Sequence, residues 1–157
     1  EMRMWLPDFK KIRRISSKRK GDSFMASDLS YEDLTSRDLD KHDYERKEDE
    51  VIDGIDCYVI EVIPSSEAES SYLKHKSWIN KSTLNAVKEE SFDKRGELIK
   101  RKKFSHKKVK DYYVMSEIFV ENVQKEHTTN VTFDKVEVDI GVKPSLFQEK
   151  NLKRLPR

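Results

Sequence analysis

Cysteine, glycine and long apolar runs are scarce in this chain, and each shortage excludes a class of protein. The single cysteine among 157 residues, Cys57, cannot form a disulfide within the chain. Four glycines leave none for a glycine-rich phosphate loop, because each is expected to serve a turn. No stretch approaches the roughly 18 apolar residues of a membrane-spanning helix, and no signal peptide is visible. We therefore expect neither a disulfide scaffold nor a P-loop nor a membrane helix.

Patterns that carry catalysis or hold metals are also missing. The four histidines are scattered, without the spacing of a zinc site, and no serine lies in a GxSxG elbow. The acidic pairs are adjacent in sequence, and neighbours on a strand point to opposite faces, so they are predicted to lie on the surface: Glu32/Asp33, Glu48/Asp49 and Glu89/Glu90. The sequence thus predicts a protein that is not an enzyme, with no cofactor and no metal.

Charged residues are abundant, yet 32 basic and 30 acidic side chains leave a net charge of only +2. The basic residues cluster in two places, 10–20 and 100–110. We interpret them as the water-facing sides of strands, with contact to anionic lipid or nucleic acid as the alternatives. No nucleic-acid partner is expected, because no RNA-binding motif interleaves aromatic residues with the basic runs.

The dominant pattern is a period-two alternation broken by turns, which predicts a mainly β (α+β) fold of antiparallel strands. Asp53-Gly54 is a good hairpin signal between two apolar runs. Further strands are expected near 1–6, 44–47, 55–63, 72–79, 84–92, 98–104, 112–120 and 132–140. One short helix is predicted over 27–36, where Ser30 and Asp33 have the spacing of a weak capping box.

Large rings are spread over many of these strands, and two interpretations stay open. They form the core, together with a buried Cys57, or some line an apolar cavity on the concave side of a curved sheet. One short helix is a small cover for so many strands, which favours an incompletely covered face. The ligand-binding residues predicted on this basis are Trp5, Phe24, Tyr58, Trp78, Phe92, Phe104, Phe119 and Phe133.

Several sequence blocks resemble the outer membrane lipoprotein-sorting protein family, whose members are relatives of the periplasmic carrier LolA. Residues 5–15 (WLPDFKKIRRI) match an apolar and basic block, and residues 21–34 (GDSFMASDLSYEDL) form the most specific one. Weaker blocks follow in order: 53–61 (DGIDCYVIE), 78–81 (WINK), 92–98 (FDKRGEL) and 144–147 (PSLF). The resemblance runs along essentially the whole chain, with Ala26 where the family commonly has glycine.

The resemblance implies a half-barrel of LolA/LolB type, export to the periplasm, and non-catalytic binding of lipid or lipoprotein acyl chains as a carrier or sensor. The alternative is a protein-interaction or regulatory module of the cell envelope, with an inner-membrane transporter or another envelope protein as partner. Residues 1–157 are expected to form a single LolA-like domain without the family's N-terminal helix and first strands. A homodimer through exposed strand edges is a further possibility.

Overall fold

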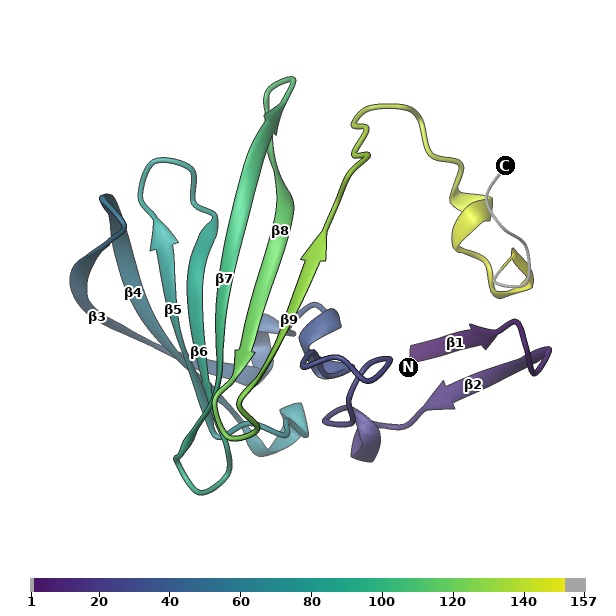
Figure 1. Ribbon diagram of the computed structural model, residues 1–157, viewed down its shortest axis with the longest axis horizontal. Coiled ribbons are helices and arrows are strands. Elements are labelled where there is room, and N and C mark those ends of the chain that lie inside the picture. Colours follow the sequence, from purple (N-terminus) through teal and green to yellow (C-terminus); the bar gives the residue numbers. More distant parts are fainter. Residues whose placement is uncertain (1, 152–157) are drawn as a thin grey trace.

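The computed structural model describes residues 2–151, and its main element is one open, curved antiparallel sheet of seven strands (Figure 1). Each strand pairs with the next one in the sequence, which makes the sheet a meander. The strands are β3 (His42–Ile52), β4 (Ile55–Pro64), β5 (Lys74–Asn80), β6 (Ala86–Phe92), β7 (Leu98–Val109), β8 (Tyr112–Asn122) and β9 (His127–Thr132). The predicted mainly β fold with a curved sheet is therefore confirmed.

The Asp53-Gly54 turn between β3 and β4 has the geometry that its sequence predicts. Both residues have positive φ angles, 49° and 81°, as a two-residue type I′ turn requires. Ile52 pairs with Ile55 directly across the turn, which fixes the register of the hairpin. Asparagine, aspartate and glycine tolerate this left-handed backbone better than other residues, so an aspartate followed by a glycine predicts the turn.

The N-terminal residues form a separate hairpin of β1 (Met2–Leu6) and β2 (Lys11–Ile15). Trp5 pairs with Ile12, and residues 7–10 make the turn. In Figure 1 this hairpin projects away from the large sheet. The strand predicted near residues 1–6 is confirmed over residues 2–6, and residue 1 lies outside the described residues.

The predicted helix over 27–36 is wrong, because only one 3-10 turn forms there, η2 (Glu32–Leu34). Ser30 and Asp33 do make the reciprocal contacts of a capping box: the Ser30 amide donates to Asp33 at 2.7 Å, and the Asp33 amide donates to the Ser30 hydroxyl at 3.3 Å. The Asp33 carboxylate also binds side chains of the sheet, so tertiary contacts hold this segment in an irregular path. Ala26 has a φ of 61°, a conformation that suits the glycine common in the similar family.

The strand predicted over 132–140 is also wrong, because β9 ends at Thr132. The Phe133 amide still donates to Ser116 of β8, but no strand forms between there and residue 143. The alternating apolar residues of this stretch find no partner strand, and Lys107 and Lys110 bind its main-chain oxygens instead. Sequence periodicity predicts a strand only where a neighbouring strand is available to pair with it.

Short 3-10 turns make up the remaining elements: η1 (Ser17–Arg19), η3 (Leu39–Lys41), η4 (Ser66–Ala68), η5 (Pro144–Phe147) and η6 (Glu149–Asn151). Within residues 2–151, no helix is long and apolar enough to cross a bilayer.

The two faces of the sheet differ in what covers them. We call inner the face that residues 28–41, the cover segment, lie against, and outer the opposite face. A small apolar cluster of Cys57, Val59 and Trp78 lies on the outer face, where Val59 pairs with Trp78 across β4 and β5. Cys57 is completely buried in this cluster, as predicted.

Candidate functional site

The cover segment is attached to the inner face at both ends by side chains far apart in the sequence. At its start, the buried Asp28 accepts hydrogen bonds from the Thr129 hydroxyl, at 2.7 Å, and is paired with His127 at 2.7 Å. Both partners lie on the edge strand β9. At its end, Arg37 donates to Glu89 of β6 at 2.8 Å. The segment therefore crosses the inner face from β9 to β6.

Asp33 lies at the centre of this crossing and binds two lysines of β7. Its carboxylate is 2.7 Å from Lys100 and 2.5 Å from Lys102, and its side chain is only 2% exposed. Tyr72 lies beside this group, where it accepts from Lys100 at 2.7 Å and donates to Asp33 at 3.0 Å. A charged and hydrogen-bonded cluster thus joins the cover segment to the sheet.

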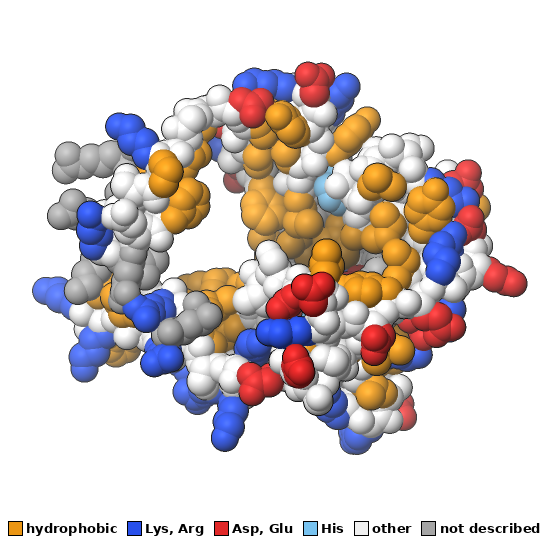
Figure 2. Space-filling view, turned by 180° about the vertical axis from the view of Figure 1, so that it is seen from behind, with side chains coloured by type: hydrophobic (Ala, Val, Ile, Leu, Met, Phe, Trp, Pro, Cys, Tyr) orange, Lys and Arg blue, Asp and Glu red, His pale blue; other side chains and the backbone are white. Residues whose placement is uncertain are grey.

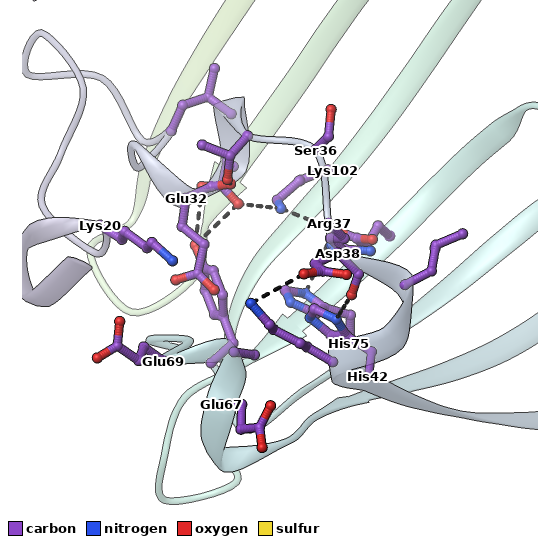
Figure 3. A pocket seen from close by; sticks show the side chains of 18 of the residues that line it. Lys20, Glu32, Ser36, Arg37, Asp38, His42, Glu67, Glu69, His75 and Lys102 are labelled. Carbon is purple, nitrogen blue, oxygen red and sulfur yellow. Dashed lines mark hydrogen bonds and ion pairs between the residues drawn. The ribbon is translucent and has the colours of Figure 1, made fainter. Parts of the chain in front are cut away.

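Glu89 continues the cluster along the inner face towards β5. It binds Lys102 at 3.0 Å and accepts from Ser77 at 2.9 Å, in addition to Arg37. His75, also buried, contacts Ser91 through Nδ1 at 2.9 Å and lies 3.6 Å from Glu89. Figure 3 shows His75 and Lys102 on the strands and Arg37 and Asp38 on the segment above them.

Burial and mutual attraction set the protonation of this inner cluster, defined by Asp33, Tyr72, His75, Glu89, Lys100 and Lys102 with Arg37 at its rim. Although burial raises the pKa of Asp33 and Glu89, the neighbouring cations hold both well below their usual range. Burial lowers the pKa of His75 to about 3, so its ring is neutral at pH 7. Burial and the Asp33 charge raise the pKa of Tyr72, which keeps its hydroxyl protonated. At neutral pH both carboxylates of the cluster are therefore ionised and the His75 ring is neutral.

The sequence does not predict this cluster, and several of its members lie elsewhere than expected. Asp33 and Glu89 were predicted on the surface, and Lys100 and Lys102 on a water-facing side, but all four side chains are buried. One signal was present: Lys100 and Lys102 alternate in step with Phe104, so two lysines share a face with a large ring. Their acidic partner on the cover segment, Asp33, could not be identified from spacing, because it lies 67 residues from Lys100 and 69 from Lys102.

Two cavities lie on either side of the cover segment. One, of about 530 Å³, lies between the segment and the inner face and is lined by Leu29, Phe104 and Ile118 as well as by members of the inner cluster. The other, of about 760 Å³, is lined by Met2, Ile15 and Tyr31 and reaches the base of the N-terminal hairpin. Four residues line both, so the cavities meet at the segment: Lys20, Thr35, Ser36 and Glu69. Figure 2 shows hydrophobic side chains around a hollow on this side of the molecule.

The structure distributes the eight predicted ligand residues over both faces of the sheet and beyond it. Phe104 lines the cavity beneath the cover segment, and Tyr58 lies on the same inner face under the Arg46 guanidinium, 4.9 Å away. Trp78, Phe92 and Phe119 point to the outer face, as their strand pairings require. Inner and outer rings cannot contact one ligand together.

The remaining three rings lie outside the sheet. Trp5 is part of the N-terminal hairpin, and Phe133 follows β9 and is partly exposed. Phe24 packs edge-to-face on Tyr31, a wall residue of the larger cavity, with ring centres 5.7 Å apart. Ligand contact by any of the eight stays a prediction, and Phe104 is the one that lines a cavity of the cover segment.

The site offers binding surfaces rather than assembled chemistry. Among the described residues, no group of three His, Cys, Asp or Glu side chains is arranged to hold a metal. The carboxylates and amines of the inner cluster neutralise one another and are fixed by hydrogen bonds. What remains accessible is a hollow lined mostly by polar and charged side chains. A few apolar side chains lie among them, Leu29, Phe104 and Ile118 beneath the cover segment and Met2 and Ile15 beside the hairpin. This mixture suits a ligand that has both apolar and polar parts.

Comparisons with solved structures place this architecture among known folds. An outer membrane lipoprotein-sorting protein domain from Vibrio parahaemolyticus is similar over 96% of this chain, with 32% identity and a TM-score of 0.89. A DUF1329 family protein from Desulfovibrio piger is similar over 94% of the chain, with 33% identity and the same TM-score. The chain spans only 64% and 62% of these two proteins. A LolA superfamily protein from Nitrosomonas europaea has the same fold at 18% identity, with a TM-score of 0.63 over 92% of this chain and 67% of that one.

No curated protein matches the chain. A family model described as "-like: Uncharacterized protein" matches residues 1–154. The fold shared with the lipoprotein-sorting domain agrees with the resemblance of the sequence blocks to that family. The chain thus belongs to this uncharacterized family, and it shares its fold with the lipoprotein-sorting domain and the LolA superfamily protein named above.

Proposed function

We propose that this chain is part of a periplasmic protein that binds lipid or lipoprotein acyl chains without catalysis, as a carrier or sensor. The observation that carries the proposal is the pair of adjoining cavities beside the cover segment. Their volumes, about 530 and 760 Å³, lie in the range of ligand pockets, about 300–1,000 Å³. The fold is one that the similar lipoprotein-sorting domain also has, which supports an acyl-chain ligand by analogy.

Apolar burial would drive this binding. Each methylene group that leaves water contributes about 0.8 kcal/mol, so a long chain needs no charged contact to bind tightly. The walls offer Leu29, Phe104 and Ile118 on one side and Met2 and Ile15 on the other. The inner cluster would lie next to the polar end of the ligand, where it costs the least desolvation.

The chain covers only part of the proteins that share its fold. This chain spans under two thirds of the first two similar structures, and we propose that residues 1–157 are a single unit of a larger half-barrel. Further elements of the full protein would then enclose the hollow more completely.

A fluorescent fatty acid such as parinaric acid tests the site directly. Ser36 lies in the wall shared by both cavities, so Ser36→Trp should fill part of each and weaken binding about tenfold, the equivalent of two lost methylene contacts. Ser82→Trp, in the distant turn between β5 and β6, is the matched control and should leave affinity unchanged.

Native mass spectrometry of the full protein, isolated from membrane extract, provides the second measurement. A co-purifying lipid that the Ser36→Trp variant lacks would support the proposal. If no lipid co-purifies and no fatty acid binds, the acyl-chain function is wrong.

A protein-interaction module is the second candidate, and the segment after β9 favours it. Residues 133–147 carry large apolar side chains that are more than a third exposed: Phe133, Ile140, Val142, Leu146 and Phe147. Exposed apolar residues in such number are typical of contact surfaces. Crosslinking from position 147 to an inner-membrane transporter or another envelope protein would support this function over the carrier function.

A second copy of the chain is also a candidate partner. In the seven-stranded sheet, β3 and β9 each have one neighbour, and such edges can pair with another strand. Light scattering of the purified chain would detect a dimer of this kind.

A further inference from the structure

The N-terminal hairpin and the turn after it hold most of the excess positive charge of the molecule. Residues 2–20 contain eight Lys and Arg against one Asp, whereas the rest of the chain has 24 basic and 29 acidic residues. The chain is almost neutral overall, but its positive charge is concentrated at the N-terminal end and the rest carries a small negative excess. Figure 2 shows Lys and Arg side chains gathered at the end of the molecule where this hairpin lies.

Lysines of the sheet and lysines of the hairpin differ in their partners. On the outer face, Lys74, Lys76 and Lys88 each bind a glutamate at 2.8–2.9 Å. Within residues 2–151, the side-chain amines of Lys10 and Lys11 at the hairpin turn have no carboxylate within 4 Å. The charges of these three outer-face lysines are neutralised within the sheet, whereas those of Lys10 and Lys11 at the hairpin turn are available to an external anion.

The same turn also presents apolar groups next to these charges. Phe9, between Pro7 and Lys10, is 71% exposed. On one face of the hairpin, Met4 pairs with Arg13 and Leu6 pairs with Lys11, so apolar and basic side chains lie side by side. An exposed ring beside long cationic side chains is the combination that binds the interface of an anionic bilayer, where the ring enters the headgroup region and the cations meet phosphate.

We infer that the β1–β2 hairpin is a docking surface for an anionic lipid bilayer. The inference goes beyond ligand binding in the cavities, because it concerns association of the protein with a membrane surface. Nucleic acid fits less well: residues 2–20 include no Asn or Gln to contact base edges, and the exposed ring lies at a turn rather than on a stacking platform.

Vesicle co-sedimentation tests the inference with the full chain. Vesicles of phosphatidylcholine mixed with phosphatidylglycerol should bind the protein, those of phosphatidylcholine alone should not, and added salt should weaken binding. Replacing Lys10, Lys11 and Arg13 together by Gln should weaken it on the order of a hundredfold, at about fivefold per charge. The matched control replaces three exposed lysines of the sheet and the segment after it, Lys108, Lys125 and Lys135, and should bind as the unmodified chain does.

A second pair of variants tests the apolar part. Phe9→Ser should weaken vesicle binding about tenfold, whereas Leu84→Ser, at an equally exposed turn of the sheet, should not change it. Circular dichroism checks that all variants fold.

Three results would overturn the inference: equal binding to both vesicle types, equal losses in the hairpin and control variants, or hairpin-dependent binding of duplex DNA or an acidic protein without vesicle binding. Lys10, Lys11, Arg13 and Phe9 do not line the two cavities, so fatty-acid binding should survive in these variants. Failure of the docking surface and failure of the carrier function can thus be told apart.

Discussion

The inner and outer faces of the sheet use the same charged residue types in opposite settings. Lys102 is buried between Asp33 and Glu89, whereas the next residue, Lys103, is exposed and lies 3.7 Å from an equally exposed Asp53. On the outer face, Lys76 and Lys88 lie over the Trp78 ring at 4.7 and 4.2 Å with their charges near water. Strand alternation decides which way a lysine points, and the element above it decides whether the charge is buried.

The largest effect should come from removing the central cation. Lys102→Met leaves Asp33 and Glu89 with too little compensating charge in a buried place, and it should lower the free energy of unfolding by about 3–5 kcal/mol. Lys103→Met, the matched control on the outer face, should change it by no more than about 0.5 kcal/mol. Urea unfolding at pH 7 measures both, and equal losses in the two variants would contradict the difference between the faces.

The next effect depends on pH and belongs to His75. Its pKa is about 3 in the folded protein and 6.5 as the ordinary value, so the unfolded chain binds a proton that the folded one rejects. Stability should therefore fall as the pH drops from 6.5 towards 3, by up to about 1.4 kcal/mol per pH unit from this residue.

His75→Gln should remove most of this slope. His106→Gln is the control: burial lowers the pKa of His106 as well, but that side chain is less buried, so its removal should flatten the slope less. Asp33 and Glu89 contribute stability that is lost only below their ordinary pKa values, 3.8 and 4.5. Unfolding midpoints between pH 7 and 5 therefore separate the histidines from these two carboxylates, and an unchanged slope in His75→Gln would refute the assignment.

The smallest of the three effects concerns one hydroxyl. Tyr72→Phe removes contacts to Asp33 and Lys100 and should cost about 1.5–3 kcal/mol, the usual range for hydrogen bonds to charged groups. Tyr58→Phe, on the same inner face but more than a third exposed, should cost less than about 0.5 kcal/mol. A denaturant midpoint that shifts equally in the two variants would count against a special role of the inner cluster.

Local features of the fold were predictable from the sequence. The Asp53-Gly54 turn and the alternation in β4 and β8 depend on backbone geometry and on nearest neighbours, so short windows contain the needed information. Ser30 and Asp33 also paired as their spacing predicts. The extent of the helix there was not predictable, because the partners that draw Asp33 away lie on β7.

The candidate site was less predictable than the fold for the same reason. Lys100 and Lys102 look like surface lysines until the cover segment is placed over them, and that placement depends on pairs such as Asp28 with Thr129, 101 residues apart. The eight rings predicted to contact a ligand lie on several strands, and the pleat directs Trp78 and Phe119 away from Phe104. Inner and outer rings differ only in whether the cover segment lies over their face of the sheet, and amino-acid composition does not predict which face that is.

The order of the strands has a consequence for how the molecule acquires its structure. Because β3 to β9 are neighbours in sequence as well as in space, each pairing closes a short loop, and the sheet can grow one hairpin at a time. The contacts of Asp33 with Lys100 and Lys102 close loops of 67 and 69 residues and carry a larger entropy cost. We therefore expect the cover segment to dock after the meander has formed, so that the hollow and the inner cluster are the last part of the molecule to assemble and the first to open.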